Sequence, residues 1–328
     1  MSVAGPDADI VVWRTEQQGP PSPDELARCD ALINCRSRNS VTRQTVADMA
    51  RCRIVSQAGV GFNHIDLVAC AERGIPVCNT PDYGTSEVAD HAVALALALT
   101  RGIVAYNGKL QRREMGWHAR EQTTVRRLTG RTFGIAGLGR IGTAAALRAK
   151  AFNVDIAFYD PYLPAGAERA FNFRRVTSLA ELFEVSDVVS VHTPLTEETT
   201  GFINADALAH AKPGCVLVNT SRGGTMDLDA VHDALRSGQL AGAGLDVLPV
   251  EPMTYEHPLI RAFEANEDWL DGRLIITPHA AFFSPEGLAD MRRISTQTVV
   301  DYLNHGVTRS CVNEGLLAEF EARRAAAE

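Results

Sequence analysis

The feature that most constrains this chain is a glycine pattern, G-x-G-x-x-G, at Gly137–Gly142. A β-prone run, Thr132–Ala136, leads directly into it, and a stretch of helical composition from Thr143 to Ala151 follows. A second β-prone run, Val154–Tyr159, ends at Asp160. The order of strand, glycine turn, helix, strand and acidic residue predicts the phosphate-binding turn of a dinucleotide-binding domain.

Each glycine of this pattern has its own purpose. Gly137 permits the tight turn, Gly139 lets the backbone approach a pyrophosphate, and Gly142 lets the helix pack closely on the strand. The pyrophosphate binds at the helix N-terminus, where backbone N–H groups have no partner within the helix. We therefore expect Arg140 and Ile141 to contact the cofactor as well.

Asp160 distinguishes between two cofactors. Its carboxylate accepts hydrogen bonds from ribose hydroxyls and repels a 2′-phosphate. The next residues, Pro161 and Tyr162, include no Arg that would hold such a phosphate. The sequence therefore predicts NAD rather than NADP.

The remainder of the chain alternates β-branched runs with Ala- and Leu-rich stretches of helical length, which predicts an α/β fold. With 328 residues, 45% of them hydrophobic, the chain can bury two cores. We expect two doubly wound domains, with a Rossmann NAD-binding domain inserted in a flavodoxin-like substrate-binding domain. The predicted division gives residues 1–103 and 283–328 to the substrate-binding domain and residues 104–282 to the NAD-binding domain.

Ten strands are expected. Those of the first third are Asp9–Trp13, Ala31–Asn34, Arg53–Val55 and Ile75–Cys78. Those of the second domain are Thr132–Ala136, Val154–Tyr159, Val188–Val191, Val216–Asn219, Gly242–Val247 and Leu274–Thr277. Long helices are expected from about Ser86 to Thr100 and from about Pro285 to Asn304.

Four chemically useful side chains follow the last three strands. They are Arg222, Asp246, Glu251 and His279. Ligands of open α/β sheets bind beyond the carboxyl ends of the strands, so these side chains are predicted to meet at the nicotinamide.

The residue types fit the reduction of a 2-oxo acid. A histidine, with an ordinary pKa near 6.5, can give a proton to the carbonyl oxygen as hydride arrives, which predicts His279 as the acid/base. Glu251 would orient the imidazolium and favour its charge, and Arg222 would grip the substrate carboxylate. Two readings stay open for Asp246, a helix cap or a supporting carboxylate. His192 is a candidate cofactor contact, whereas His91, inside an apolar helix, is interpreted as a core histidine.

Taken together, these motifs resemble the D-isomer-specific 2-hydroxyacid dehydrogenase family over nearly the whole chain. The stretches that carry the resemblance are Gly137–Gly142 with Asp160, His192–Leu195, Asn219–Gly224, Gly244–Val247, Glu251-Pro252 and Thr277–Ala280. The resemblance implies a D-isomer, the roles given above for His279, Glu251 and Arg222, and an auxiliary role for Asp246. It also implies substrate contacts at Val60 and Gly61, cofactor contacts at Thr85, Thr193, Thr220 and Asp246, and a homodimer joined through the NAD-binding domain.

Within this family, some stretches look closest to the C-terminal-binding-protein branch. They are Ala146–Phe152, Phe158–Tyr162 and Cys311–Asn313. That branch typically has a Trp against the substrate three residues after the catalytic His, and here the position is Phe282. Phe282 is therefore a predicted substrate contact with a different shape.

Composition excludes other functions. A net charge of −8 and a pI of about 5.6 argue against nucleic acid as a partner. No apolar run reaches the length of a membrane span, and Met1–Asp9 has no signal-peptide pattern. Seven cysteines, an odd number without a CxxC pair, favour reduced thiols in the cytoplasm over disulfides or a metal site.

Two alternatives to a simple 2-oxo acid reductase stay open. One is an NAD-sensing interaction protein, which the intact Arg222, Glu251 and His279 argue against. The other is an enzyme that oxidises phosphite or 3-phosphoglycerate. Such a substrate needs additional cations, for which Arg36, Arg38 and Arg113 are available.

Overall fold

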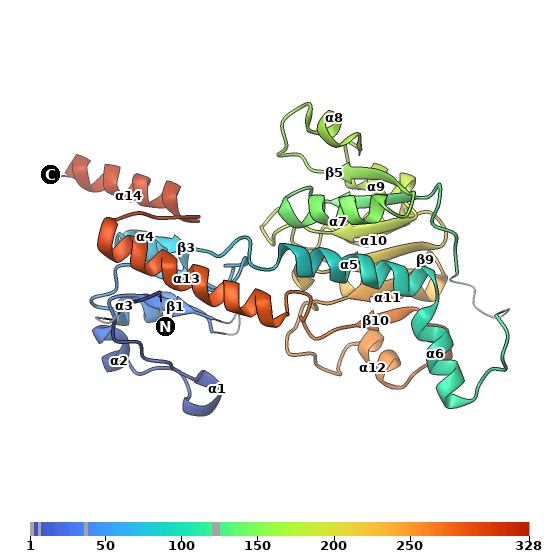
Figure 1. Cartoon of the computed structure of the whole chain (residues 1–328), viewed down its shortest axis with the longest axis horizontal. Helices are drawn as coiled ribbons and strands as arrows, with labels where there is room; N and C mark the ends of the chain where they lie inside the picture. The colour runs from blue at the N-terminus through green and yellow to red at the C-terminus, as the bar shows by residue number, and fades with distance from the viewer. Residues whose placement is uncertain (1–2, 6–7, 36–38, 120–124, 328) are drawn as a thin grey trace. The chain divides into compact units, whose positions relative to one another are not determined.

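The computed structural model describes residues 3–5, 8–35, 39–119 and 125–327. Its contacts divide the chain into a terminal unit, Met1–Gly84 with Phe283–Glu328, and a central unit, Thr85–Phe282 (Figure 1). The first boundary therefore lies at residue 84 rather than at the expected residue 103. The reason is that helix α5 (Thr85–Thr100) packs on the central sheet and on helix α7 (Arg140–Lys150).

The central unit is built on a seven-stranded sheet with the order β10-β9-β8-β7-β4-β5-β6, in which every neighbouring pair is parallel. The strands are β4 (Thr132–Ala136), β5 (Asp155–Tyr159), β6 (Arg174–Arg175), β7 (Val188–Val191), β8 (Cys215–Asn219), β9 (Leu240–Leu245) and β10 (Leu274–Ile276). This is the doubly wound order, with its topological switch between β4 and β7. The six strands expected here are present with small shifts at their ends, and only the short β6 was not foreseen.

Helices cover both faces of this sheet (Figure 1). Alternate residues of β8 face opposite cores: Val216 and Val218 belong to one cluster, and Leu217 belongs to the other. Helices α5 and α7 cover the first face. The second face is covered by α9 (Leu179–Val185), α10 (Ala205–Ala209), α11 (Leu228–Ser237) and α12 (Pro258–Glu264). The remaining elements are α6 (Ile103–Arg112), α8 (Ala167–Phe171), η1 (Gly223–Thr225) and η2 (Asp268–Leu270).

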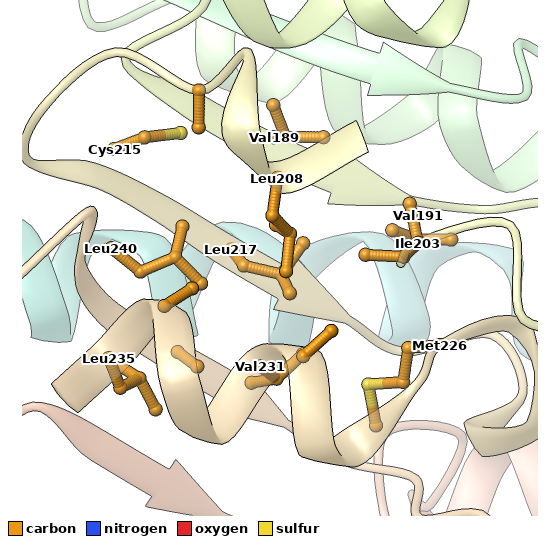
Figure 2. Packing of buried hydrophobic residues seen from close by; sticks show 14 of the residues in the cluster. Val189, Val191, Ile203, Leu208, Cys215, Leu217, Met226, Val231, Leu235 and Leu240 are labelled. Atoms are coloured by element: carbon orange, nitrogen blue, oxygen red, sulfur yellow. The ribbon is translucent and has the colours of Figure 1, made fainter. Parts of the chain in front are cut away.

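The core on the second face fixes β8 against two helices (Figure 2). Leu217 of β8 has no exposed surface and packs with Leu208 of α10 and Val231 of α11. Replacing such a leucine by alanine typically costs about 2–5 kcal/mol of folding free energy. The carboxyl end of β8, where the candidate site begins, is therefore rigidly placed.

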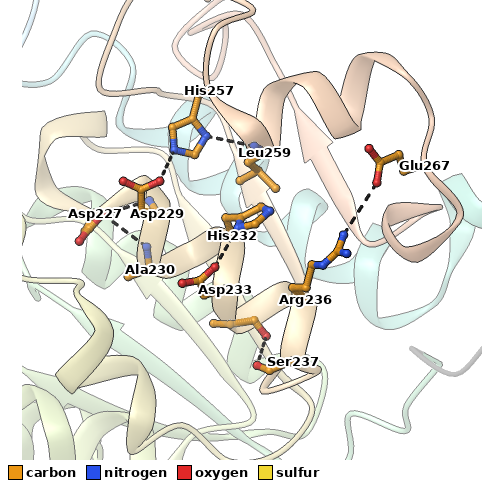
Figure 3. Close-up of polar contacts among 11 residues, drawn as sticks. Asp227, Asp229, Ala230, His232, Asp233, Arg236, Ser237, His257, Leu259 and Glu267 are labelled. Carbon is orange, nitrogen blue, oxygen red and sulfur yellow. Dashed lines mark hydrogen bonds and ion pairs between the residues drawn. The ribbon is translucent and has the colours of Figure 1, made fainter.

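Polar contacts attach the segment before β10 to α11 (Figure 3). His257 precedes α12, and its Nδ1 accepts from the Leu259 N–H at 3.1 Å. Its Nε2 therefore carries the proton and donates to Asp229 of α11 at 3.0 Å. Arg236 of α11 also pairs with Glu267 at 3.9 Å. The stretch between β9 and β10 is thus an ordered part of the central unit.

The terminal unit contains a parallel sheet of three strands, β1 (Leu32–Asn34), β2 (Val55–Gln57) and β3 (Val77–Cys78), in the order β1-β2-β3. Its helices are α1 (Thr15–Gln18), α2 (Pro23–Arg28), α3 (Arg43–Asp48), α4 (Leu67–Glu72), α13 (Pro285–His305) and α14 (Glu314–Ala327). One face of the sheet packs on α2, α3 and α4, and the other packs on α13.

The expected strand at Asp9–Trp13 is wrong. This segment pairs with no strand, and Val11 is 75% exposed. β propensity describes how well a residue fits a pleated, half-buried surface, so an apolar run without a sheet edge beside it does not form a strand.

Among the described residues, no single helix has the length and apolarity of a membrane span. The pair α5 and α6, bent by 59°, meets that standard of length and composition only when the two are joined.

Candidate active site

The glycine turn after β4 has the geometry predicted for it. Gly137 has a φ of +89°, which only glycine adopts readily. A Cβ on Gly142 would lie 2.1 Å from the Gly137 carbonyl oxygen, so this position must also be glycine. Nothing lies within 4 Å of a Cβ built on Gly139, and no side chain caps the helix that begins at Arg140 and Ile141. The turn therefore leaves open space for an anion, next to the free N–H groups in the first turn of an eleven-residue helix.

Asp160 is tied to this turn. One carboxylate oxygen accepts from the Leu138 N–H at 2.9 Å, and the other accepts from the Tyr162 N–H at 3.0 Å. The carboxylate is thus held at the end of β5, beside the glycines, where a ribose would meet it.

Two buried hydroxyls beyond β7 and β8 have no hydrogen-bond partner among the described residues. They belong to Thr193 and Thr220, both predicted to contact the cofactor. Thr193 also lies against the glycine turn, since its Cγ2 would be 3.0 Å from a Cβ on Gly137. Buried hydroxyls are normally hydrogen-bonded, so these two orphans fit a site completed by a polar ligand such as NAD.

His192 directly follows β7, next to Thr193. Its Nε2 is 2.9 Å from the Ser190 hydroxyl. Burial lowers the pKa of His192 to about 4, so the ring is neutral at physiological pH.

The predicted acid/base and its partner are in direct contact. His279 Nδ1 is 2.7 Å from Glu251 Oε2, and the Leu248 N–H donates to Glu251 Oε1 at 3.1 Å. Since a carboxylate only accepts, Nδ1 carries a proton and Nε2 is the nitrogen left for chemistry. The His279 side chain is 30% exposed, and its ring meets Phe282 edge-on at 6.2 Å.

Glu251 is ionised over a wide pH range. Burial raises the pKa of Glu251, but four other effects together outweigh burial: the hydrogen bond and charge of His279, the Leu248 N–H and the charge of Arg222. The net result is a pKa below the usual value. Arg222, Glu251 and His279 thus form one electrostatically linked group within the central unit.

A buried asparagine organises the Arg222 loop. Asn219, at the end of β8, donates from Nδ2 to the Arg222 carbonyl at 3.1 Å and to the Thr225 hydroxyl at 3.2 Å. Its Oδ1 accepts from the N–H and the hydroxyl of Ser221. The Arg222 guanidinium itself donates to the Ser221 carbonyl at 2.7 Å. Asn219 belongs to the Asn219–Gly224 motif, but the sequence alone predicts no role for it.

The Arg222 loop and the Glu251 loop approach each other through a glycine. A Cβ on Gly223 would lie 1.9 Å from the carbonyl carbon of Leu248. Any side chain at Gly223 would push the two loops apart. This contact brings Arg222 and Glu251 to the same edge of the sheet.

Asp246 is a supporting carboxylate, since its side chain bonds to the loop after β10. Its side chain is 1% exposed and accepts from the Thr277 hydroxyl at 2.6 Å, the Ala280 N–H at 2.8 Å and the Ala281 N–H at 3.0 Å. Its backbone carbonyl also accepts from the His279 N–H at 2.8 Å. Asp246 therefore organises the loop that carries His279.

His91 is not simply a core histidine, as the sequence suggested. Its Nε2 is 3.0 Å from the Thr277 hydroxyl and 3.8 Å from Asp246 Oδ1, and its side chain is 26% exposed. The sequence does contain a signal for these contacts of His91. His91, Leu95 and Leu99 are spaced four residues apart, which places all three on the same face of the helix.

The remaining predicted residues are distributed over both units. Val60 and Gly61 lie in a loop of the terminal unit, where the Asn79 side chain donates to the Val60 carbonyl at 2.7 Å. Thr85 is the first residue of α5, and Phe282 is half-buried beside His279. Arg113 is exposed at the end of α6, whereas Arg36 and Arg38 lie outside the described residues. The functional roles of these residues stay predictions.

Comparison with known proteins identifies the family. The family model for the D-isomer specific 2-hydroxyacid dehydrogenase NAD-binding domain matches residues 93–281. A glyoxylate reductase of Korarchaeum cryptofilum is 34% identical over 312 residues, which cover 93% of this chain and 90% of that protein. A D-3-phosphoglycerate dehydrogenase of Bacillus subtilis is 34% identical over 294 residues, 88% of this chain but 52% of that protein.

A solved structure agrees with these relatives. The D-lactate dehydrogenase of Aquifex aeolicus, complexed with NAD and lactic acid, superposes with a TM-score of 0.74 at 28% identity, covering 87% of this chain and 86% of that one. The expected α/β fold, the family and the NAD cofactor are confirmed, whereas the C-terminal-binding-protein branch stays a prediction. The chain belongs to the D-isomer specific 2-hydroxyacid dehydrogenase family and is an NAD-dependent enzyme.

Proposed function

We propose that this enzyme reduces a small 2-oxo acid to the D-2-hydroxy acid. The observation that carries the proposal is the 2.7 Å contact between His279 Nδ1 and Glu251 Oε2, with Arg222 acting on the same carboxylate. When bound, NADH supplies the hydride that C2 of the substrate receives. The overall reaction consumes one 2-oxo acid, one NADH and one proton.

Arg222 binds the substrate. A guanidinium matches a carboxylate with two parallel hydrogen bonds, and its charge polarises the neighbouring carbonyl. The loop that carries Arg222 is held by Asn219 and packed on the Glu251 loop through Gly223, so the guanidinium starts from a restricted position.

His279 moves the proton. In the direction of reduction the ring carries both protons, and the Nε2 proton passes to the carbonyl oxygen as C2 is reduced. Glu251 holds the Nδ1 proton, so the ring cannot turn its other nitrogen toward the substrate. In the reverse direction the same Nε2 accepts the hydroxyl proton.

A small acid is the first candidate. Phe282 presents a ring beside His279, which would limit the substrate side chain. One relative is named glyoxylate reductase, which supports glyoxylate as the first substrate to try.

The experiment follows NADH absorbance with a series of 2-oxo acids from glyoxylate and hydroxypyruvate to aryl-substituted acids. We expect turnover of at least one acid, weak turnover with NADPH, and loss of turnover in His279→Ala with NADH affinity retained. Fluorescence titration measures that affinity independently of turnover.

Tight NADH binding without turnover of any acid would overturn the proposal and favour an NAD-sensing interaction protein. Turnover of 3-phosphoglycerate or phosphite alone would also overturn it and would direct attention to Arg113. Equal activity with NADPH would contradict the role proposed for Asp160.

We also propose a homodimer formed through the central unit. Only Ala105 of α6 is buried, while Ile103 of that helix and Trp117 after it are exposed apolar side chains. Light scattering should give twice the chain mass, and Ile103→Arg with Trp117→Arg should halve it. Val307→Arg, at an exposed site of the terminal unit, is the control that should change nothing. A wild-type monomer at micromolar concentration contradicts the proposal.

A further inference from the structure

Helix α5 and strand β9 fit together by matched spacing. Leu99 lies against Gly242 and Leu95 lies against Gly244, since a Cβ on either glycine would be 3.0 Å from the facing leucine. Four residues of helix rise about 6 Å, and two residues of strand extend about 6.6 Å. The same spacing, continued by four residues toward the start of α5 and by two residues toward the carboxyl end of β9, brings residue 91 beside residue 246.

His91 and Asp246 occupy that next step. His91 Nε2 lies 3.8 Å from Asp246 Oδ1, too far for a hydrogen bond. The Thr277 hydroxyl lies between them, 3.0 Å from His91 Nε2 and 2.6 Å from Asp246 Oδ1. The helix thus reaches the supporting carboxylate through one hydroxyl.

The chemistry of these groups fixes the direction of both hydrogen bonds. A carboxylate only accepts, so the Thr277 hydroxyl must donate its single hydrogen bond to Asp246. The Thr277 oxygen is then an acceptor toward His91, and His91 must donate from Nε2. A hydroxyl held by a donor on one side and an acceptor on the other cannot rotate.

Asp246 bonds to Thr277, Ala280 and Ala281, and the loop formed by these residues carries His279, the proposed acid/base. His279 has a φ of +53°, a region that non-glycine residues occupy only when the surroundings hold them. The hold comes from Asp246, through the N–H groups of Ala280 and Ala281. Whatever fixes the Asp246 carboxylate therefore also fixes His279.

We propose that His91 is a positioning residue for His279, acting through Thr277 and Asp246. This inference rests on the proposed function, because its kinetic consequence needs His279 as the acid/base. His91 touches neither substrate nor cofactor in this scheme. It supplies the N–H that locks the Thr277 hydroxyl onto Asp246, and losing it loosens the His279 loop.

The test is a set of substitutions at His91 with a second one at Thr277. His91→Leu removes the donor. His91→Gln keeps an amide N–H at the place of Nε2, whereas His91→Asn puts it at the place of Nδ1, so the Gln and Asn variants form a matched pair. Thr277→Val removes the hydroxyl through which His91 acts.

We expect His91→Leu to lower kcat about tenfold, with KM for the 2-oxo acid and NADH affinity changed less than twofold. His91→Gln should recover most of kcat, and His91→Asn should not. In the Thr277→Val background, His91→Leu should have little further effect, because coupled residues are not additive. Equal thermal midpoints across the set exclude global unfolding as the cause.

Hydrogen exchange supplies a readout that needs no substrate. The N–H groups of Ala280 and Ala281 should exchange faster in His91→Leu and Thr277→Val than in wild type, while the Arg222 loop is unchanged. If wild type turns over no acid but this exchange pattern holds, the proposed function fails and the positioning link stands. Unchanged kcat and unchanged exchange in His91→Leu, or additive effects with Thr277→Val, overturn the link itself.

Discussion

Two loops at one edge of the central sheet, the Arg222 loop and the His279 loop, are held in place by different chemistry. Asn219 holds the first with two donated and two accepted hydrogen bonds, so a neutral amide is fully satisfied. Asp246 holds the second with three accepted bonds and donates none. Both side chains are almost wholly buried.

The difference shows what each loop depends on. An amide supplies its own donors, and the hydrogen bonds described above for the Asn219 side chain all stay within residues 219–225. A carboxylate needs donors from elsewhere, and one of them, Thr277, has to be oriented by His91 on α5. The carboxylate that supports the His279 loop is therefore linked to a distant helix, whereas the amide that supports the Arg222 loop bonds to its neighbours along the chain.

The largest contrast is expected when the functional side chain of each loop is removed. His279→Ala should lower kcat by about 10²–10⁴-fold, the usual contribution of a general acid. Arg222→Gln should act mainly on KM for the 2-oxo acid, because it removes the carboxylate anchor. Steady-state kinetics on both variants decide this, and the reverse pattern would break the assignment of roles.

A smaller effect is expected from exchanging amide and carboxylate in the supporting residues. Asp246→Asn must place an N–H against the Ala280 or Ala281 N–H, which should cost about 1–3 kcal/mol of folding stability and lower kcat. Asn219→Ser keeps a polar group and should change KM more than kcat. Urea unfolding and kinetics measure both. Wild-type kcat in Asp246→Asn would mean that the His279 loop needs no carboxylate.

The next prediction concerns pH and Glu251. Because the pKa of Glu251 is lowered in the folded protein, its stabilising contribution is present above the pKa of the unfolded chain and disappears as pH falls through the lower folded pKa. Glu251→Gln should therefore be less stable than wild type near neutrality, and the two should converge in acid. Thermal unfolding from pH 3 to pH 8 tests this, and a constant gap at every pH would contradict it.

The smallest effect is expected at His192, a histidine without a carboxylate partner. Its folded pKa of about 4 lies below the usual 6.5. Between pH 4 and pH 6.5, the unfolded chain therefore binds a proton at His192 that the folded chain does not bind. Wild type should lose stability as pH falls through this window, by at most about 1.4 kcal/mol per pH unit. His192→Gln should flatten that dependence in urea unfolding at pH 4.5 and pH 7. An unchanged slope would mean that the buried ring takes up a proton.

Local sequence was sufficient where structure depends on neighbours along the chain. The glycine turn, Asp160 and the strands β4, β7 and β8 were predicted because turn geometry and β-branched runs act over a few residues. The same pattern failed at Asp9–Trp13, where strand formation needs a sheet edge that the segment itself cannot supply.

The residue types of the site came from the sequence, and their organisation came from the tertiary structure. Arg222, Glu251 and His279 could be named because parallel strands end at one edge. His279 is supported by Asp246, Thr277 and His91, which come from different elements. Along the chain, His91 and His279 lie 188 positions apart. No local pattern fixes which hydroxyl donates to which carboxylate, because hydrogen-bond direction is decided only when the groups meet in a buried place.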